Sequence, residues 1–166
     1  MIEDLRILGE VAVALILGGI IGLEREMARK PAGLRTHALV AAAACLFVAL
    51  GRLLQDYNMD QLAVPADAVV RTDPVRIIEA IVTGISFLGA GTIIRSSEHE
   101  RVEGLTTAAT ILVAAAVGVT VAIERWVIAI GIVLLVLFIA RGVKRLENRL
   151  NIHRERRGHA EGQQHT

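Results

Sequence analysis

The sequence predicts an all-α protein, a polytopic membrane helical bundle of about five transmembrane helices. The 166 residues are 54% hydrophobic with a mean hydropathy of +0.55, above the apolar share of roughly 45–50% in soluble domains. A soluble bundle helix carries a wide polar face, yet 104–123 and 126–140 contain no charged residue. Charge-free runs lie at 11–23, 36–51, 80–94, 104–123 and 126–140.

Each run can be extended to a membrane span. A spanning helix needs about 20 mostly apolar residues, and charged side chains near helix ends can reach the interface. Only Glu124 and Arg125 separate the last two runs, and together these runs are about twice one bilayer crossing, which favours two spans and a tight turn. The expected spans are 5–23, 36–54, 76–94, 105–123 and 126–141.

The basic residues predict the orientation. Cytoplasmic loops carry an excess of Lys and Arg, and with five spans 13 of the 18 Lys and Arg residues fall on one side of the membrane. The N-terminus is therefore expected outside and the C-terminus in the cytosol. We divide the chain into a transmembrane domain, 1–141, and a cytosolic tail, 142–166, which reads as a basic amphipathic helix on anionic lipid followed by a disordered end.

Small residues indicate how the spans pack, since helices in lipid associate through close contacts of small side chains. Four-residue spacing relates Ala14, Gly18 and Gly22 in the first span, and a similar row occupies the fourth. We expect spans one, three and four at the centre and span five facing lipid. The same rows could equally dimerise the protein.

A charged hairpin joins the first two spans and is the first candidate site. Pro31, Ala32 and Gly33 break the helix, and Thr36 can cap the second span. If the two helices are antiparallel, carboxylates at the end of the first span can meet Arg35. An exposed salt-bridge cluster of little energetic value and a gate, cation site or partner site are equally compatible with this chemistry. The candidate residues are Glu24, Arg25, Glu26, Arg35 and Thr36.

A second motif leads into the third span. Asp73 and Arg76 precede a glycine-rich segment that contains Gly84, Gly89 and Gly91. Unwound helix segments in transporters free backbone carbonyls for ions, but close helix packing at glycine is the interpretation that we favour.

A third motif, Gly104 to Ala109, opens the fourth span. Thr106 and Thr107 can cap its start, and the positive end of the helix dipole could attract an anion, or the carboxylate of Glu24 or Glu26. Capping alone suffices to explain both threonines.

Two acids lie nearest the bilayer interior, Glu10 and Glu79. Ionisable residues inside membranes are functional candidates, although these two lie about one turn from the expected outer interface, where snorkelling is nearly as good an explanation. The single cysteine, Cys45, supports neither a disulfide nor a metal pair. We expect no metal site and no cofactor.

The three motifs together resemble the MgtC/SapB family of bacterial membrane proteins. The resemblance covers about residues 5–140 and rests on Gly22 to Glu26, Pro31 to His37, and the two glycine-led runs that follow in the same order. It implies about five spans in the bacterial inner membrane, an external N-terminus, and a role in adaptation to low magnesium. By this resemblance, MgtC-like members are associated with restraint of the F-type ATP synthase and altered ion homeostasis rather than with proven magnesium transport. Ser86 departs from the family's usual glycine, and the chain has no room for the ACT-like domain of virulence-type members, so it resembles the short SapB-like branch.

These observations favour a non-enzymatic regulator or accessory protein of ion homeostasis, acting under magnesium limitation and in acid stress through contacts with other membrane proteins. The alternative is a small magnesium or proton transporter, in which Glu24, Glu26, Glu79 and the Gly89–Gly91 segment line a path. No nucleophile–base arrangement indicates an enzyme; His37 is the one histidine near the bundle. The expected partners are anionic lipid, a second copy of the chain, or a membrane protein complex. The resemblance suggests the F-type ATP synthase as such a complex. The net charge of +1 gives no reason to expect nucleic acid.

Overall fold

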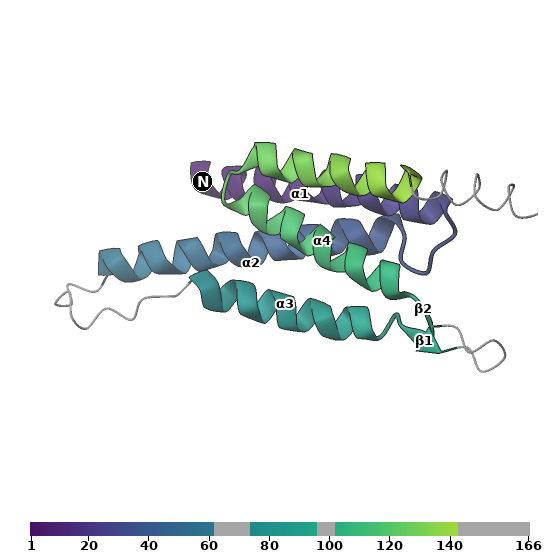
Figure 1. Ribbon diagram of the computed structural model, residues 1–166. Helices are drawn as coiled ribbons and strands as arrows, with labels where there is room; N and C mark the ends of the chain where they lie inside the picture. Colours follow the sequence, from purple (N-terminus) through teal and green to yellow (C-terminus); the bar gives the residue numbers. More distant parts are fainter. Residues whose placement is uncertain (62–73, 96–101, 143–166) are drawn as a thin grey trace, which may run out of the picture.

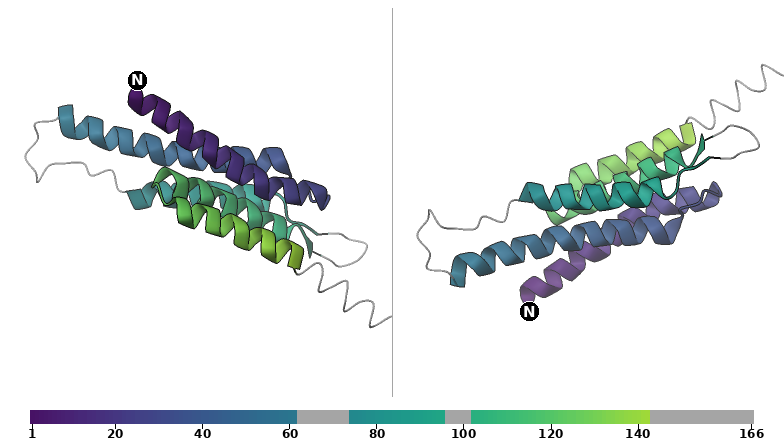
Figure 2. Two further views of the ribbon diagram at one scale, coloured as in Figure 1. Left: turned by 90° about the horizontal axis from the view of Figure 1, so that it is seen from above. Right: turned by 90° about the horizontal axis from the view of Figure 1, so that it is seen from below.

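The computed structural model describes residues 1–61, 74–95 and 102–142, and within these ranges the chain is almost entirely helical. The helices alternate in direction, so that the N-terminus, the start of α3 and the turn after α4 lie at one end of the bundle (Figures 1 and 2). The opposite end holds the α1–α2 turn and a two-residue antiparallel strand pair. The elements are α1 (Ile2–Met27), α2 (Leu34–Gln61), α3 (Pro74–Ala90), β1 (Ile94–Arg95), β2 (Val102–Glu103), α4 (Leu105–Ala122) and a last helix, Trp126–Gly142.

The membrane helical bundle predicted from the sequence is confirmed. Three helices, α1, α2 and α4, are long and apolar enough to cross a membrane, and Trp126–Gly142 is a shorter apolar helix. The helix α3 has 17 residues, about 25 Å at 1.5 Å per residue, which is slightly less than a hydrocarbon core of about 30 Å. The helices α1 and α2 contain the first two expected spans, 5–23 and 36–54, and extend beyond them at both ends into the flanking charged residues.

Two helices end in a left-handed residue that is not glycine. At the end of α1, Arg29 has φ 55°, and the amide of Lys30 bonds back to the carbonyl of Arg25 at 3.0 Å. At the end of α4, Glu124 has φ 59°, and the amide of Arg125 bonds back to Thr120 at 2.9 Å. Both are Schellman motifs, which satisfy the last carbonyls of a helix. The expected tight turn at Glu124 and Arg125 is confirmed.

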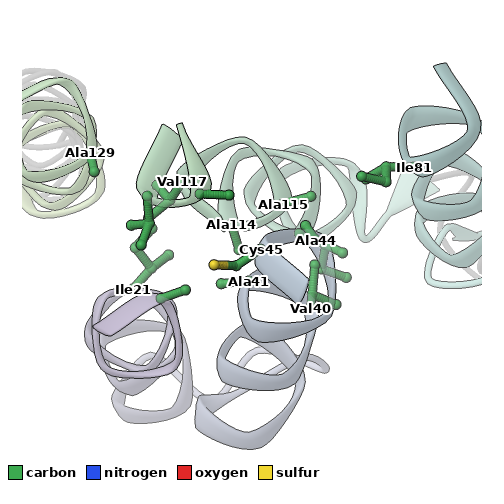
Figure 3. Packing of buried hydrophobic residues seen from close by; sticks show 14 of the residues in the cluster. Ile21, Val40, Ala41, Ala44, Cys45, Ile81, Ala114, Ala115, Val117 and Ala129 are labelled. Atoms are coloured by element: carbon green, nitrogen blue, oxygen red, sulfur yellow. The ribbon is translucent and has the colours of Figure 1, made fainter. Parts of the chain in front are cut away.

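The core lies between α1, α2 and α4 and is built mainly from alanine and β-branched side chains (Figure 3). Ala14 and Gly18 of α1 are buried, and a Cβ added to Gly18 would lie 2.5 Å from the carbonyl oxygen of His37 in α2. A Cβ on Gly118 of α4 would overlap the carbonyl oxygen of Ala41. The predicted small-residue rows therefore pack inside the chain.

One expectation about the arrangement of the spans was wrong: α2, and not α3, is central. In α2 a continuous face of small side chains is buried, including Ala41 and Cys45 at 0% exposure. In α3 only Ile81 and Gly89 are buried. Glycine content does not predict centrality, because the four consecutive alanines of α2 allow close approach as well. The last helix buries Ala129 and Val133 and exposes most of its other large side chains, as expected for a helix facing lipid.

Candidate functional site

The end of the bundle near the α1–α2 turn contains a buried polar cluster, which we call the Arg25 cluster. Its members come from three helices: Glu24 and Arg25 from α1, His37 from α2, and Thr107 and Thr110 from α4. All five are buried, with His37 fully inaccessible. Arg25 Nη2 donates to Thr107 Oγ1 at 3.1 Å. The cluster therefore ties together the three helices that form the core.

The ring of His37 is held at both nitrogens. Its Nδ1 lies 2.9 Å from the carbonyl oxygen of Gly33, and its Nε2 lies 3.1 Å from Oγ1 of Thr110. A carbonyl only accepts, so Nδ1 carries a proton, and in a neutral ring the Thr110 hydroxyl donates to Nε2. In a protonated ring Nε2–H donates instead, and the hydroxyl is free to donate to the carbonyl of Thr107, 3.0 Å away. The hydrogen-bond partners of His37 therefore fix the orientation of its ring.

Two charged atoms of the Arg25 cluster have no hydrogen-bond partner among the described residues, Glu24 Oε2 and Arg25 Nε. A buried polar atom without a partner costs about 1–3 kcal/mol, and more if it is charged. The charges of Glu24 and Arg25 also interact with each other and with His37. The cluster thus retains one acceptor and one donor for a bound group, next to a guanidinium that disfavours cations.

The rest of the hairpin motif lies outside this cluster. Glu26 is exposed, and its Oε2 accepts from the amide of Leu34 at 2.9 Å, which caps the first turn of α2. Arg35 is exposed and makes no ion pair with any residue that the structure describes. The expected meeting of the carboxylates with Arg35 is therefore wrong. So is the capping role of Thr36, because α2 begins two residues earlier, at Leu34.

The threonines that open α4 have different roles from those expected. The N-cap residue is Gly104, at φ 91°, and it makes no side-chain cap. Thr106 is exposed, whereas Thr107 is buried and accepts from Arg25. Thr107 therefore holds a cation, not the carboxylate of Glu24 or Glu26, and neither threonine caps the helix.

Within the glycine-rich motif of α3, Gly89 makes a packing contact, whereas Gly84 is exposed with nothing within 4 Å of an added Cβ. The helix is continuous from Pro74 to Ala90, so the idea of an unwound segment is not supported. A Cβ on Gly89 would lie 3.3 Å from that of Ala108, which places α3 against α4. Gly91 follows the end of the helix, and its amide bonds back to Phe87.

The other candidates near α3 do not gather at one site. Arg76 is exposed and lines an apolar groove of about 770 Å³ between α2 and α3. Glu79 is exposed near the start of α3, towards the opposite end of the bundle from Glu24. Asp73 and the tail beyond residue 142 lie outside the described residues. The structure thus does not bring together the carboxylates that the transporter hypothesis requires.

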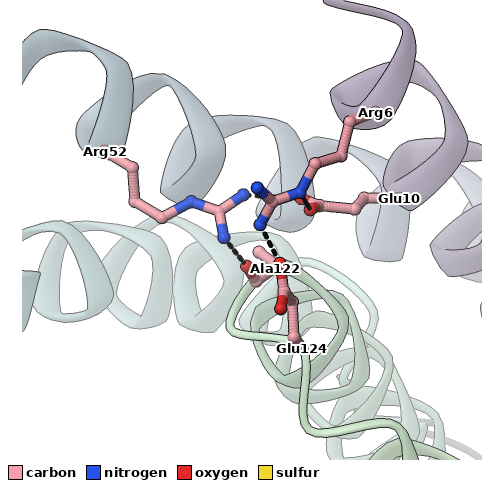
Figure 4. Close-up of polar contacts among 5 residues, drawn as sticks. All are labelled: Arg6, Glu10, Arg52, Ala122 and Glu124. Atoms are coloured by element: carbon pink, nitrogen blue, oxygen red, sulfur yellow. Dashed lines mark hydrogen bonds and ion pairs between the residues drawn. The ribbon is translucent and has the colours of Figure 1, made fainter. Parts of the chain in front are cut away.

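A second polar cluster, which we call the Glu10 cluster, lies at the end of the bundle near the N-terminus (Figure 4). Glu10 is buried and accepts from Arg52 Nη2 at 2.6 Å and from Arg6 Nε at 3.2 Å. Arg6 also pairs with Glu124, and Arg52 also donates to the carbonyl of Ala122. Of the two predicted intramembrane acids, Glu10 is thus part of an ion-pair network, while Glu79 makes no ion pair with any described residue.

Sequence reasoning missed Thr110 and Arg52, and it considered His37 only as a catalytic residue. A signal for them exists in the helical spacing. The intervals from His37 through Ala41 and Cys45 to Arg52 are four, four and seven residues, which places these residues on one face of α2. Within the described residues, no group of three His, Cys, Asp or Glu side chains could hold a metal ion.

Comparisons with known proteins support the resemblance. Residues 11–149 match the model of the MgtC family. The chain is 34% identical over 141 residues to protein SrpB of Synechococcus elongatus, which covers 81% of this chain and 73% of SrpB. It is 42% identical over 109 residues to protein MgtC of Brucella abortus, and 41% identical over 110 residues to the "Putative magnesium transporter YhiD" of Escherichia coli K12. Each of these two alignments covers 66% of this chain but only 39% and 47% of the relative, so the chain spans less than half of their length. No solved structure matches.

Proposed function

Because the chain belongs to the MgtC family, we propose that it is a non-enzymatic membrane protein that supports bacterial magnesium homeostasis by acting on other membrane proteins, and not by carrying ions itself. The link to magnesium comes from the name of one relative, YhiD. The choice of regulation over transport comes from the interior of the bundle.

The observation that carries this choice is the distribution of buried polar groups. Among the described residues, every buried polar or charged side chain belongs to either the Arg25 cluster or the Glu10 cluster. These clusters lie at opposite ends of the bundle. The core between them contains Ala14, Ala41, Cys45 and Val117, each at 0% exposure.

An ion that crosses a membrane needs polar groups along its path to replace its water. In the part of the chain that the structure describes, the middle of the bundle has no buried polar side chain, and the contact between Gly118 and the backbone of Ala41 leaves no room there for an added methyl group. The guanidinium of Arg25 also lies at the end of the bundle where a cation path would open. A single copy of the chain is thus built as a sealed bundle.

The transporter remains the second candidate, and the name of YhiD favours it. Purified protein in liposomes that contain a magnesium-sensitive or pH-sensitive dye separates the two functions. We expect no flux above that of empty liposomes. Magnesium or proton flux that is lost in Glu24→Gln would establish transport and overturn our proposal.

Growth of a deletion strain tests the link to homeostasis. We expect impaired growth at limiting magnesium, which the wild-type gene rescues and Arg25→Met does not. Arg35→Met should also rescue growth, because Arg35 is exposed and forms no ion pair with a described residue. Acid stress is the second condition to compare. Equal growth of the deletion strain and its parent under both conditions would remove the basis of the proposal.

We further propose that the protein lies in the inner membrane with its N-terminal end outside, as the Lys and Arg distribution favours. A C-terminal reporter that is active only in the cytosol should be active. A C-terminal reporter that is active only outside the cytosol would reverse this orientation.

A further inference from the structure

The groove between α2 and α3, which we call the α2–α3 groove, has apolar walls and a charged end. Its volume of about 770 Å³ lies within the range of about 300–1,000 Å³ that is typical of ligand sites. Among the described residues that line it, Arg76 alone is charged and the others are apolar. Arg76 lies in the first turn of α3, which begins at Pro74. The groove therefore runs along the bundle from an apolar interior to a cation near one end.

Small residues leave this groove open. Ala44 lines it from α2, and Ala80 and Gly84 line it from α3. A Cβ added to Gly84 would meet nothing within 4 Å. The two helices nevertheless touch near Arg76, where a Cβ added to Gly51 would overlap the side chain of Ile77. The hollow is thus part of the surface between two helices that lie side by side (Figure 1).

The charge of Arg76 is not matched within the described part of the chain. Arg76 forms no ion pair with any described residue. The described acids nearest to the groove lining in sequence are Asp56 and Glu79, and neither lines the groove. Asp56 lines instead a small pocket between α1 and α2 together with Arg52. Since charged side chains of membrane helices usually pair with an opposite charge, Arg76 offers a site for an anion at the end of the groove.

We propose that the α2–α3 groove binds one membrane phospholipid, with an acyl chain in the groove and the phosphate on Arg76. A guanidinium forms strong charge-assisted hydrogen bonds with a phosphate. Along α3 the lining extends from Arg76 to Ile85, about 14 Å at 1.5 Å per residue. One leaflet has a similar depth, since the hydrocarbon core of both leaflets is about 30 Å thick. An acyl chain whose headgroup lies at the membrane surface therefore matches the groove in length and polarity.

Other occupants match these features less well. A free anion would contact Arg76 but would leave the apolar walls uncovered. A helix of a second copy or of another protein would need an acid at the depth of Arg76. Phe47 and Leu54, which line the groove, are 56% and 58% exposed, so an acyl chain can enter sideways from the bilayer. The inference does not depend on the proposed function, because its tests measure lipid binding alone.

Native mass spectrometry of the full chain, purified in a mild detergent with added phosphatidylglycerol, tests the groove. We expect one retained lipid per chain. Gly84→Leu should fill the groove and lower the affinity for this lipid by about tenfold. The matched control is Gly9→Leu, because Gly9 is also an exposed helical glycine with nothing within 4 Å of an added Cβ, and it does not line the groove. Equal retention by the two variants, or no lipid retained by the wild type, would overturn the proposal.

Charge substitution tests the headgroup contact independently. Arg76→Gln should also lower the affinity by about tenfold, whereas Arg76→Lys keeps the charge and should retain most of the binding. Arg125→Gln is the control, because Arg125 is exposed at the same end of the bundle and forms no ion pair with a described residue. Equal losses for Arg76→Gln and Arg125→Gln would show non-specific attraction and refute the site.

Two further outcomes would assign the groove to another occupant and so refute the proposal. Displacement of the retained lipid by inorganic phosphate would show that Arg76 binds a free anion. A lipid-free dimer that Gly84→Leu dissociates would show that a second copy of the chain fills the groove.

Discussion

The hydrogen bond between Arg25 and Thr107 gives the sharpest test of the Arg25 cluster. The perturbation is Thr107→Val, which keeps the shape of the side chain and removes the oxygen that accepts from Arg25 Nη2. The neighbouring Thr106 is exposed, and no hydrogen bond of its side chain was found among the described residues, so Thr106→Val is the matched control.

The expected loss follows from the burial of this contact. Hydrogen bonds to charged groups contribute about 1.5–3 kcal/mol in proteins, while polar pairs between membrane helices reach about 1.7 kcal/mol. Arg25 is only 4% exposed and already has one atom without a partner. We therefore expect Thr107→Val to lower the free energy of unfolding by about 1–2 kcal/mol, a factor of about 5–30 in the unfolding equilibrium.

Unfolding in mixed micelles of increasing SDS content, followed by far-UV circular dichroism, measures this loss. Thr106→Val should leave the transition within about 0.5 kcal/mol of wild type. In the double variant with Arg25→Met, the two changes should be non-additive, since both remove the same bond. Equal stability of Thr107→Val and Thr106→Val, or strict additivity with Arg25→Met, would refute the reasoning.

Three further predictions concern packing, the Glu10 cluster and a helix end. By the same unfolding assay, Gly118→Ala should destabilise the protein by about 1–3 kcal/mol, because the added Cβ meets the backbone of α2. The control Gly131→Ala has nothing within 4 Å of its Cβ and should be neutral or stabilising. Equal effects of the two variants would contradict the packing. Arg52→Met should lower the free energy of unfolding by about 3 kcal/mol, the lower end for a broken buried ion pair, because Arg6 still contacts Glu10. Adding Glu10→Gln should recover part of this loss, and no recovery would argue against the ion pair. Arg29→Gly should raise the free energy of unfolding by about 0.5–1 kcal/mol, because Arg29 has φ 55°, a conformation that glycine adopts more readily. Arg29→Ala should give no such gain. The same gain for both variants would show that backbone strain is not the cause.

Much of the bundle can be predicted from the sequence because lipid imposes simple rules. Apolar runs of the right length, the two-residue turn at Glu124 and Arg125, and the rows of small residues all follow from the need to satisfy the backbone within each helix and to pack closely. These rules do not predict which helix lies at the centre of the bundle. Whether the alanines of α2 or the glycines of α3 occupy the centre depends on which surfaces fit together in three dimensions.

The candidate site was predicted only in part, for a physical reason. Treating the charges after Leu23 as a loop placed Arg25 in solvent. In the structure α1 continues to Met27, so that Arg25 follows Gly18 and Gly22 on the same helical face and enters the bundle. The sequence spacing contains this information, but it becomes readable only once the end of the helix is known, and helix ends are the least predictable part of a helix.

The pairing of Arg6 with Glu10 has a consequence for how the protein enters the membrane. The two residues are one helical turn apart on α1, and their side chains are 3.2 Å apart. Nascent α1 therefore carries a counter-charge for its buried acid before α2 or α4 has been synthesised, which lowers the barrier to inserting Glu10 into lipid. Arg52 and Glu124 are synthesised later, and their ion pairs with Glu10 and Arg6 extend the local pair into a network that links α1 to α2 and to the turn after α4. The order of synthesis thus matches the order in which the charges can be neutralised.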